Sequence, residues 1–211
     1  MAAPHGRRLQ RRQDTIEEAL DHAVDVMTEQ GVGALTISEV ARRLGMRAPS
    51  VYKYFPEGLH AVYDGLFARA VQAAGAAAAR STETLPPGVA RLRAGGRDYV
   101  RWAVENPALA QLQHWRVVPG FEPSADSMAL SHRSMQTAMA ELQGAVDVGE
   151  LEPTALDEQA VASWTVLLSG LMTQQLANEP GASFDEGRFT RMTDAVLDLW
   201  FDRYATRPRR T

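Results

Sequence analysis

The hydrophobic residues between positions 36 and 55 recur at helical spacing on both sides of a glycine. Those before the glycine lie three or four residues apart, on one face of a helix: Ile37, Val40, Ala41 and Leu44. After Gly45, the apolar residues Val51 and Phe55 stand four residues apart and give a second segment its own buried face. The pattern predicts two short helices joined by a tight turn.

Residues at the helix ends support this prediction. Thr36 precedes the first helix, where its hydroxyl can accept a hydrogen bond from a free backbone N–H group. Gly45 stands where the chain must turn with a positive φ angle. Pro49 lies in the first turn of the second helix, where its missing N–H costs little. Two helices joined in this way form a helix-turn-helix, whose second helix reads DNA in the major groove.

The turn and the second helix carry groups that can bind DNA. Four basic residues and no acidic residue lie between Arg42 and Tyr54. We predict a DNA-binding set formed by the capping threonine, the turn and the outer face of the second helix: Thr36, Arg47, Ala48, Pro49, Ser50, Tyr52, Lys53 and Tyr54. Lys53 and Tyr54 are expected on the exposed face, opposite Val51 and Phe55. The alternative is an ordinary helical hairpin with a solvated basic face.

Residues 13–71 resemble the N-terminal DNA-binding domain of TetR-type transcriptional regulators. The resemblance rests on four stretches, at residues 16–31, 35–37, 40–45 and 49–55. One position departs from the family pattern. Where the family usually has a lysine that holds a phosphate, three residues after the phenylalanine, this chain has Gly58. Lys53, Tyr54 or the N-terminus of the following helix could replace that contact.

The remaining pattern is helical throughout, and no segment alternates as a strand would. We therefore predict an all-α fold. A three-helix head over residues 13–73 is expected to precede a larger helical domain over residues 85–205. The clearest break in the chain, over residues 82–88 with Pro86 and Pro87, lies at the start of this second domain. A helix over residues 57–80 would link the two. Residues 1–12 are expected to form a flexible basic arm, which is either solvated or in contact with phosphates or the minor groove.

The last two predicted helices carry more apolar residues than one buried stripe needs. The final helix is expected over residues 185–204, with Leu197 and Phe201 off its main apolar face. This surplus favours a homodimer in which the final two helices of each copy form a four-helix bundle. A monomeric core is the alternative.

Aromatic and polar side chains mix in the middle helices, as they do in mostly apolar ligand pockets with a few polar anchors. We predict a small-molecule effector site from the following residues: Tyr99, Trp102, Gln111, His114, Trp115, Phe121, Trp164, Leu168, Met172 and Gln175. For each of them a purely structural role in the core is equally open. Residues 117–123 and 164–170 also look like segments of the ligand-binding half of some TetR-type regulators, which implies an effector.

Composition limits the remaining possibilities. The net charge of −4 argues against a protein that coats nucleic acid, although it allows a local basic surface. The chain has no cysteine, which suits the reducing cytoplasm, and no apolar run of about 20 residues that would span a membrane. No catalytic constellation stands out, and the five histidines lack the helical partners that chelate a metal. We expect no enzymatic activity, no metal and no cofactor.

These patterns together predict a DNA-binding transcriptional regulator, with double-stranded operator DNA and a small apolar effector as its partners. Repression that the effector relieves is the expected mode, and activation is the alternative. The linking helix is expected to carry the change between the two domains. The alternative is an all-helical small-molecule-binding protein or enzyme whose N-terminal hairpin does not bind DNA.

Overall fold

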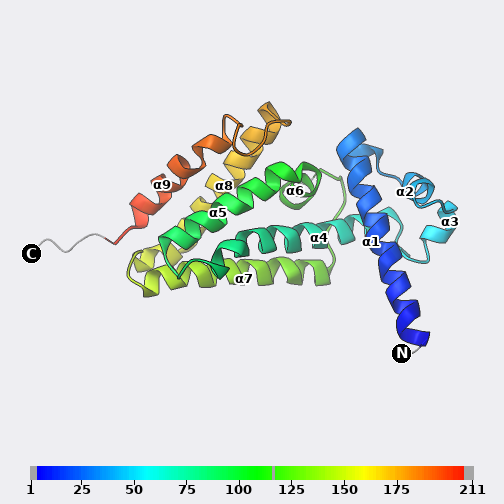
Figure 1. The fold of residues 1–211 in the computed structure, drawn as a ribbon, viewed down its shortest axis with the longest axis horizontal. Helices are drawn as coiled ribbons and strands as arrows, with labels where there is room; N and C mark the ends of the chain where they lie inside the picture. The colour runs from blue at the N-terminus through cyan, green and yellow to red at the C-terminus, as the bar shows by residue number, and fades with distance from the viewer. Residues whose placement is uncertain (1–3, 116, 207–211) are drawn as a thin grey trace, which may run out of the picture. The chain divides into compact units, whose positions relative to one another are not determined.

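The computed structural model describes residues 4–115 and 117–206, and these residues form helices and loops (Figure 1). The α-helices are α1 (Pro4–Gln30), α2 (Ile37–Arg43), α3 (Ala48–Val51), α4 (Leu59–Ala79), α5 (Val89–Glu105), α6 (Pro107–His114), α7 (Ala125–Asp147), α8 (Glu158–Asn178) and α9 (Thr193–Tyr204). Four short 3₁₀ helices are η1 (Val32–Ala34), η2 (Arg80–Glu83), η3 (Pro153–Leu156) and η4 (Thr190–Met192). Within the described ranges the backbone forms no strand, so the predicted all-α fold is confirmed.

The chain divides into two compact units. The first unit comprises Met1–Ala70 and Ala108–Met128, and the second comprises Val71–Pro107 and Ala129–Thr211. The three boundaries therefore fall inside α4, at the start of α6 and inside α7. The segment Ala108–Met128, expected in the larger domain, groups instead with the N-terminal helices.

The core of the first unit forms where α1 meets the helix-turn-helix and the start of α4. One face of α1 is buried along Ala19, Ala23 and Val26. On the outside, Arg69 of α4 pairs with Glu17 at 2.5 Å and with Asp21 at 2.6 Å. These ion pairs hold α1 against α4. Helices α2 and α3 lie along one side of α1 (Figure 1).

Helix α1 begins earlier than the sequence suggested. Of the flexible arm expected at residues 1–12, residues 4–12 are the first turns of α1, and residues 1–3 lie outside the described residues. The side chains from Gly6 to Asp14 are all exposed, so this part of the helix has no buried face. Its stability comes from continuity with the packed part of α1, which the sequence pattern at residues 1–12 does not reveal.

The second unit packs α5, α8 and α9 around an aromatic cluster. Trp200 donates its indole N–H to Ala160 O at 2.9 Å and lies edge-on to Trp164. Leu197 and Phe201 of α9 are buried in this cluster, with 0% and 4% of their surface exposed. The expectation that these two residues face a partner subunit is therefore wrong, because α5 and α8 already cover them.

The final helix also starts later than predicted. Residues 185–192 form turns and η4, and α9 begins only at Thr193. The buried amide of Gln175 holds this segment: its oxygen accepts hydrogen bonds from the N–H groups of Phe189 and Thr190, at 3.1 and 3.3 Å. Its nitrogen donates to Glu179 O at 2.9 Å. A side chain outside the segment thus fixes the segment's conformation.

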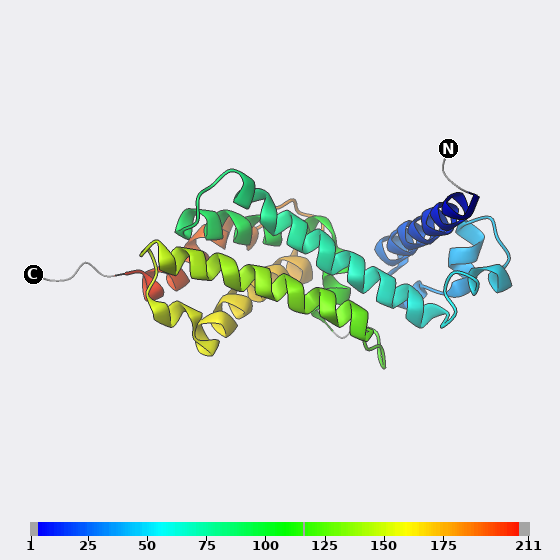
Figure 2. The ribbon, with the colours of Figure 1, turned by 90° about the horizontal axis from the view of Figure 1, so that it is seen from below.

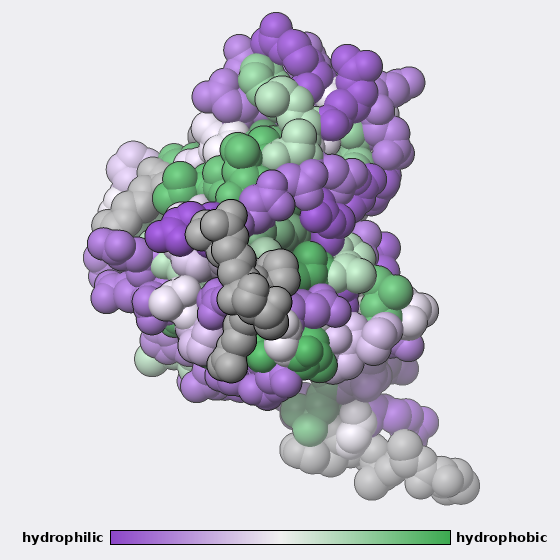
Figure 3. All heavy atoms as spheres, turned by 90° about the vertical axis from the view of Figure 1, so that its left-hand side faces the viewer, coloured by the Kyte–Doolittle hydropathy of each residue, from purple (hydrophilic) through white to green (hydrophobic). Residues whose placement is uncertain are grey.

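Within the second unit, the later part of α4 runs beside α7 in both views of the ribbon (Figures 1 and 2). Large apolar side chains also remain at the surface of this unit, namely Met135, Val148, Val166, Met192 and Leu199. In the view of Figure 3, hydrophobic residues reach the surface between hydrophilic ones. No helix of the described residues is both long and apolar enough to cross a membrane.

Candidate nucleic-acid interface and effector site

The turn between α2 and α3 is fixed by its own hydrogen bonds. Thr36 Oγ1 accepts the N–H of Glu39 at 3.1 Å and caps α2, as predicted. At the other end, Gly45 has a φ angle of 65°. The N–H of Met46 then bonds to Ala41 O at 2.9 Å, which is the long hydrogen bond of a Schellman motif. The turn therefore needs no DNA to order it.

Helix α3 spans only Ala48–Val51, but the chain stays coiled to Phe55. Regular α-helix ends at Val51, after which Tyr54 N–H bonds to Val51 O at 2.9 Å and Phe55 N–H to the same oxygen at 3.0 Å. We call residues 48–54 the reading segment. Val51 and Phe55 are buried beneath it, with 0% and 4% of their surface exposed.

Most of the predicted DNA-binding residues reach the surface. The exposed ones are Thr36, Arg47, Pro49, Tyr52 and Lys53, and the half-buried ones are Ala48, Ser50 and Tyr54. Lys53 therefore lies opposite Val51 and Phe55, as expected. Tyr54 is only partly accessible. The reading segment thus presents cationic, hydroxyl and aromatic groups that are at least partly accessible.

Two of the four basic residues counted in the sequence are bound to glutamates. Arg42 makes two hydrogen bonds to the carboxylate of Glu39, at 2.8 and 2.6 Å. Arg43 bonds to Glu39 at 3.0 Å and to Glu29 of α1 at 2.6 Å. Hydrogen bonds from Arg42 and then Arg43 lower the pKa of Glu39 to about 2. Arg43 therefore ties α2 to α1, whereas Arg42 pairs within α2.

Arg47 and Lys53 are left as the free cations beside the reading segment. Within the part of the chain that the structure describes, neither has a carboxylate at ion-pair distance. Both are exposed. Unpaired positive charge beside the reading segment therefore comes from these two residues rather than from all four.

Gly58 lies where the family usually has a lysine. Its φ angle is 62°, in the left-handed region that favours glycine. A β-carbon added there would stand 3.2 Å from Tyr52 Cε1, which is tighter than ordinary packing. Tyr52 thus occupies the space beside this position, and the backbone itself disfavours a lysine.

The predicted effector residues of the first unit lie on and after α6. Phe121 packs its ring on Tyr63 and His60, with centroids 5.7 and 5.2 Å away. Burial lowers the pKa of His114, whose ring stands 6.3 Å from that of Trp115. Gln111 is half-buried.

Sequence reasoning missed one polar group on α6. The side-chain oxygen of Gln113 is buried and accepts no hydrogen bond within the described residues. A buried acceptor without a donor is costly, so a ligand or a water molecule that supplies one is favoured there. A second glutamine on this short, largely apolar helix, between Leu112 and His114, was the signal in the sequence.

The predicted effector residues of the second unit have mixed surroundings. Tyr99 and Trp102 lie one turn apart on α5, and burial raises the pKa of Tyr99 to about 12. Trp164 packs on Gly96 and the aromatic cluster, and the amide of Gln175 is engaged with the chain before α9. Leu168 and Met172 are buried. Packing explains the burial of these residues, and a contact with an effector stays a prediction.

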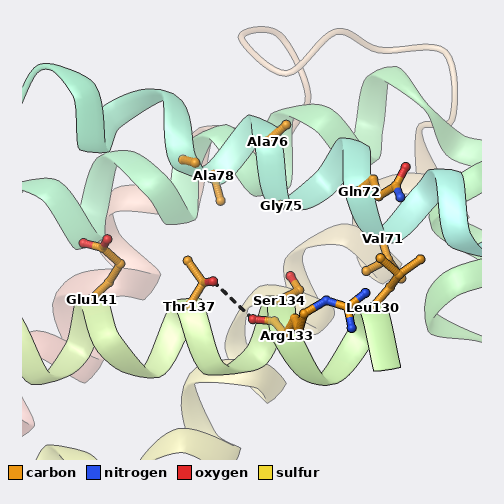
Figure 4. A pocket seen from close by; sticks show the side chains of 11 residues that line it. Val71, Gln72, Gly75, Ala76, Ala78, Leu130, Arg133, Ser134, Thr137 and Glu141 are labelled. Atoms are coloured by element: carbon orange, nitrogen blue, oxygen red, sulfur yellow. Dashed lines mark hydrogen bonds between the residues drawn. The ribbon is translucent and has the colours of Figure 1, made fainter. Parts of the chain in front are cut away.

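A groove opens in the second unit between α4 and α7 (Figure 4). It holds about 350 Å³ and has an apolar wall of small α4 residues, including Gly75 and Ala76. Across from them stand Arg133, Thr137 and Glu141 of α7, of which Glu141 accepts a hydrogen bond from Arg91 at 2.7 Å. None of the effector residues predicted from the sequence lines this groove.

Solved structures share the fold at low sequence identity. A protein of unknown function from Rhodococcus sp. RHA1 matches with a TM-score of 0.74 and 22% identity over 90% of this chain and 95% of its own. The TetR family regulator PfmR from Thermus thermophilus matches with a TM-score of 0.61 and 19% identity, over 87% and 97%. RolR, solved with resorcinol, gives a TM-score of 0.61 and 16% identity, over 94% and 91%.

Sequence models of protein families match both parts of the chain. Residues 19–57 match the bacterial regulatory proteins of the tetR family, and residues 92–197 match the tetracyclin repressor-like C-terminal domain. No protein with a curated description matches by sequence. The first match covers the capped α2, the turn and the reading segment, and the second extends from α5 into α9. The chain therefore belongs to the TetR family of DNA-binding transcriptional regulators.

Proposed function

We propose that the protein is a homodimeric repressor, which binds double-stranded operator DNA through the reading segment and releases it when a small, mostly apolar effector binds. The observation that carries the DNA-binding part is the placement of Arg47 and Lys53 on an exposed face above the buried Val51 and Phe55. Because the turn before this face is already hydrogen-bonded, the face is preorganised for a rigid surface such as a major groove.

The roles within this face follow from chemistry and position. Arg47 precedes α3, so it stands at the end of the recognition helix that enters the major groove. We assign it and Ser50 to contacts with base edges. Lys53 lies at the other end of the reading segment, where a cation binds a backbone phosphate. Tyr52 packs on Gly58 and lines the same surface.

The exposed apolar side chains of α8, η4 and α9 support the dimer. Val166 and Leu199 are each 67% exposed, and Met192 is 49% exposed. After Glu158, α8 contains no charged residue over the rest of its length. A long uncharged helix face beside exposed aliphatic groups suits a symmetric interface between two copies. These residues replace Leu197 and Phe201 as the ones we assign to the interface.

For the effector we favour a small molecule with apolar bulk and a hydrogen-bond donor. The buried acceptor of Gln113 and the burial of the His114 ring support this chemistry. The fold shared with RolR, which was solved with the small aromatic resorcinol, is compatible with it. The groove between α4 and α7 provides a second candidate location.

Release of DNA requires the effector to bind one arrangement of the paired reading segments better than another. Helix α4 contributes residues to both units, so it is the element that we assign to this coupling. The coupling is reciprocal, and about 1–3 kcal/mol is typical. Half-sites must match major grooves about 34 Å apart, so a small change in spacing is sufficient to weaken binding.

A binding selection tests the proposal directly. The full-length protein is incubated with a random pool of DNA duplexes, and the recovered sequences are read for two related half-sites. A recovered palindrome supports both DNA reading and the dimer. Recovery of no preferred sequence would leave the alternative of a helical small-molecule-binding protein. A small molecule that releases the selected duplex would then establish the effector part.

A further inference from the structure

The first turns of α1 carry a basic stripe that the helix-turn-helix does not use. Its members are Arg7, Arg8, Arg11 and Arg12. All four side chains are exposed, and the first acidic residue of the chain is Asp14. Farther along α1 the outer face turns acidic, and there Glu17 and Asp21 pair with Arg69. Charge is thus separated along a single helix.

One edge of the basic stripe, formed by Arg8 and Arg12, faces the side of α1 on which the reading segment lies. Arg8 and Arg12 recur at helical spacing with Ala19 and Ala23, which are buried against the rest of the first unit. The guanidinium of Arg12 donates a hydrogen bond to Tyr54 O, at 3.4 Å, at the end of the reading segment. The beginning of α1 extends past α2 and α3 (Figure 1).

We propose that this stripe is a second DNA-contacting element, which binds the phosphodiester backbone beside the half-site that the reading segment reads. The inference rests on the proposed DNA binding. Arg12 is a positioning residue, because its hydrogen bond to Tyr54 O keeps the helix next to the reading segment. Arg7, Arg8 and Arg11 supply the charge. As a regular helix, the stripe presents these cations at fixed spacing, whereas a flexible arm would have to be ordered on binding.

Two physical consequences separate this role from that of a solvated helix. Each phosphate that an arginine neutralises steepens the dependence of log affinity on log salt by about 0.9. The contribution should also be independent of base sequence, because phosphates carry no direct sequence information. The stripe should therefore change affinity and salt dependence without changing which sequence is preferred.

The test compares two variants of the full-length protein that each lose three positive charges. The first carries Arg7→Gln, Arg8→Gln and Arg11→Gln. The control carries the changes Arg80→Gln, Arg191→Gln and Arg203→Gln, at exposed positions of the second unit. Fluorescence anisotropy gives the affinity for duplexes recovered by selection, at several salt concentrations, and circular dichroism verifies that helix content is kept.

We expect the first variant to bind more weakly and to lose about one to three units of salt slope per head. The control should keep most of the wild-type affinity and most of the wild-type salt slope. Shortening the duplex to the half-sites should remove the difference, because the flanking phosphates are gone. Equal affinity and slope for wild type and first variant on the long duplex would overturn the inference while leaving the proposed function intact. Failure of the wild type to select any duplex would overturn both.

Discussion

The ring of Tyr52 lies against Gly58, with its Cε1 atom 3.2 Å from the position that a β-carbon would take. This contact connects the end of α3 with the start of α4. It also fills the place from which the family lysine would reach a phosphate. The departure from the family pattern is therefore a change of packing as well as a loss of charge.

Restoring the lysine should cost stability. Gly58→Lys would force a side chain into a left-handed conformation, at a cost of about 1–2 kcal/mol, and would press on Tyr52. We expect a lower melting temperature in thermal denaturation. Adding Tyr52→Ser to the Gly58→Lys protein should restore only the part of the melting temperature that crowding against Tyr52 had cost, because the backbone strain at position 58 stays. A Gly58→Lys protein as stable as wild type, with tighter DNA binding, would contradict this account.

Lys53 should contribute one phosphate contact in each head. Lys53→Ala is expected to weaken operator binding and to lower the salt slope by about 0.9 per head, because one cation no longer displaces counterions. Anisotropy titrations over a salt series measure both. Arg80→Ala, a change at an exposed residue of the second unit, is the control. If the salt slope of Lys53→Ala equals that of wild type, Lys53 does not bind a phosphate.

Glu39 should stabilise the fold in a pH-dependent way. Its pKa falls from the ordinary 4.5 to about 2 because Arg42 and Arg43 donate hydrogen bonds to it. The stabilisation is present above pH 4.5 and is lost as the pH falls toward 2. Glu39→Gln should therefore lower the melting temperature near neutral pH, and the difference should shrink in acid. Glu18→Gln, at an exposed site on α1, is the control; equal pH profiles for both variants would refute the assignment.

The dimer interface should depend on Val166 and Leu199. Replacing both by glutamate places charges on exposed apolar positions, so we expect a helical monomer in size-exclusion chromatography with light scattering. Leu197→Ala serves as the contrast, because it opens a cavity inside one chain and should cost about 2–5 kcal/mol of unfolding free energy. A glutamate variant that is still a dimer would place the interface elsewhere. A wild-type protein that is a monomer would exclude the proposed dimer.

Gln113 should anchor the effector. A small-molecule library screened by thermal shift provides a ligand, and Gln113→Leu should weaken it about threefold to tenfold through one lost hydrogen bond. The free protein should become no less stable, because the buried oxygen has no donor among the described residues. Ala76→Trp fills the groove between α4 and α7 and tests the other location. If only Ala76→Trp weakens binding of the ligand, the effector site lies in the groove and not beside Gln113.

Features set by neighbouring residues could be predicted from the sequence. The cap at Thr36, the turn at Gly45 and the buried positions Val51 and Phe55 each depend on spacing within a few residues. The pairing of Arg43 with Glu29 could not be predicted, because it joins separate helices. For the same reason the sequence placed Leu197 at a partner interface, whereas packing against other helices decides its burial.

The early start of α1 and the late start of α9 have the same origin. Residues 6–12 have no apolar face, so periodicity gave no sign of a helix there. At the other end, Gln175 fixes the residues before Thr193 from a distance along the chain. The effector residues remain predictions, since aromatic and amide groups serve core packing as well as ligand contact.

In the helix-turn-helix, different residues stabilise the fold and face the DNA side, and this affects how the DNA sequence preference of such a regulator can change in evolution. Gly45 and Val51, which shape the turn and its core, are different from Arg47 and Lys53, which face outward. Thr36 caps α2 and is also exposed. Substitutions on the outer face can therefore alter the preferred operator while the hydrogen-bonded turn stays as it is. After gene duplication, a copy could acquire new target genes through a few surface changes, without first passing through an unstable intermediate.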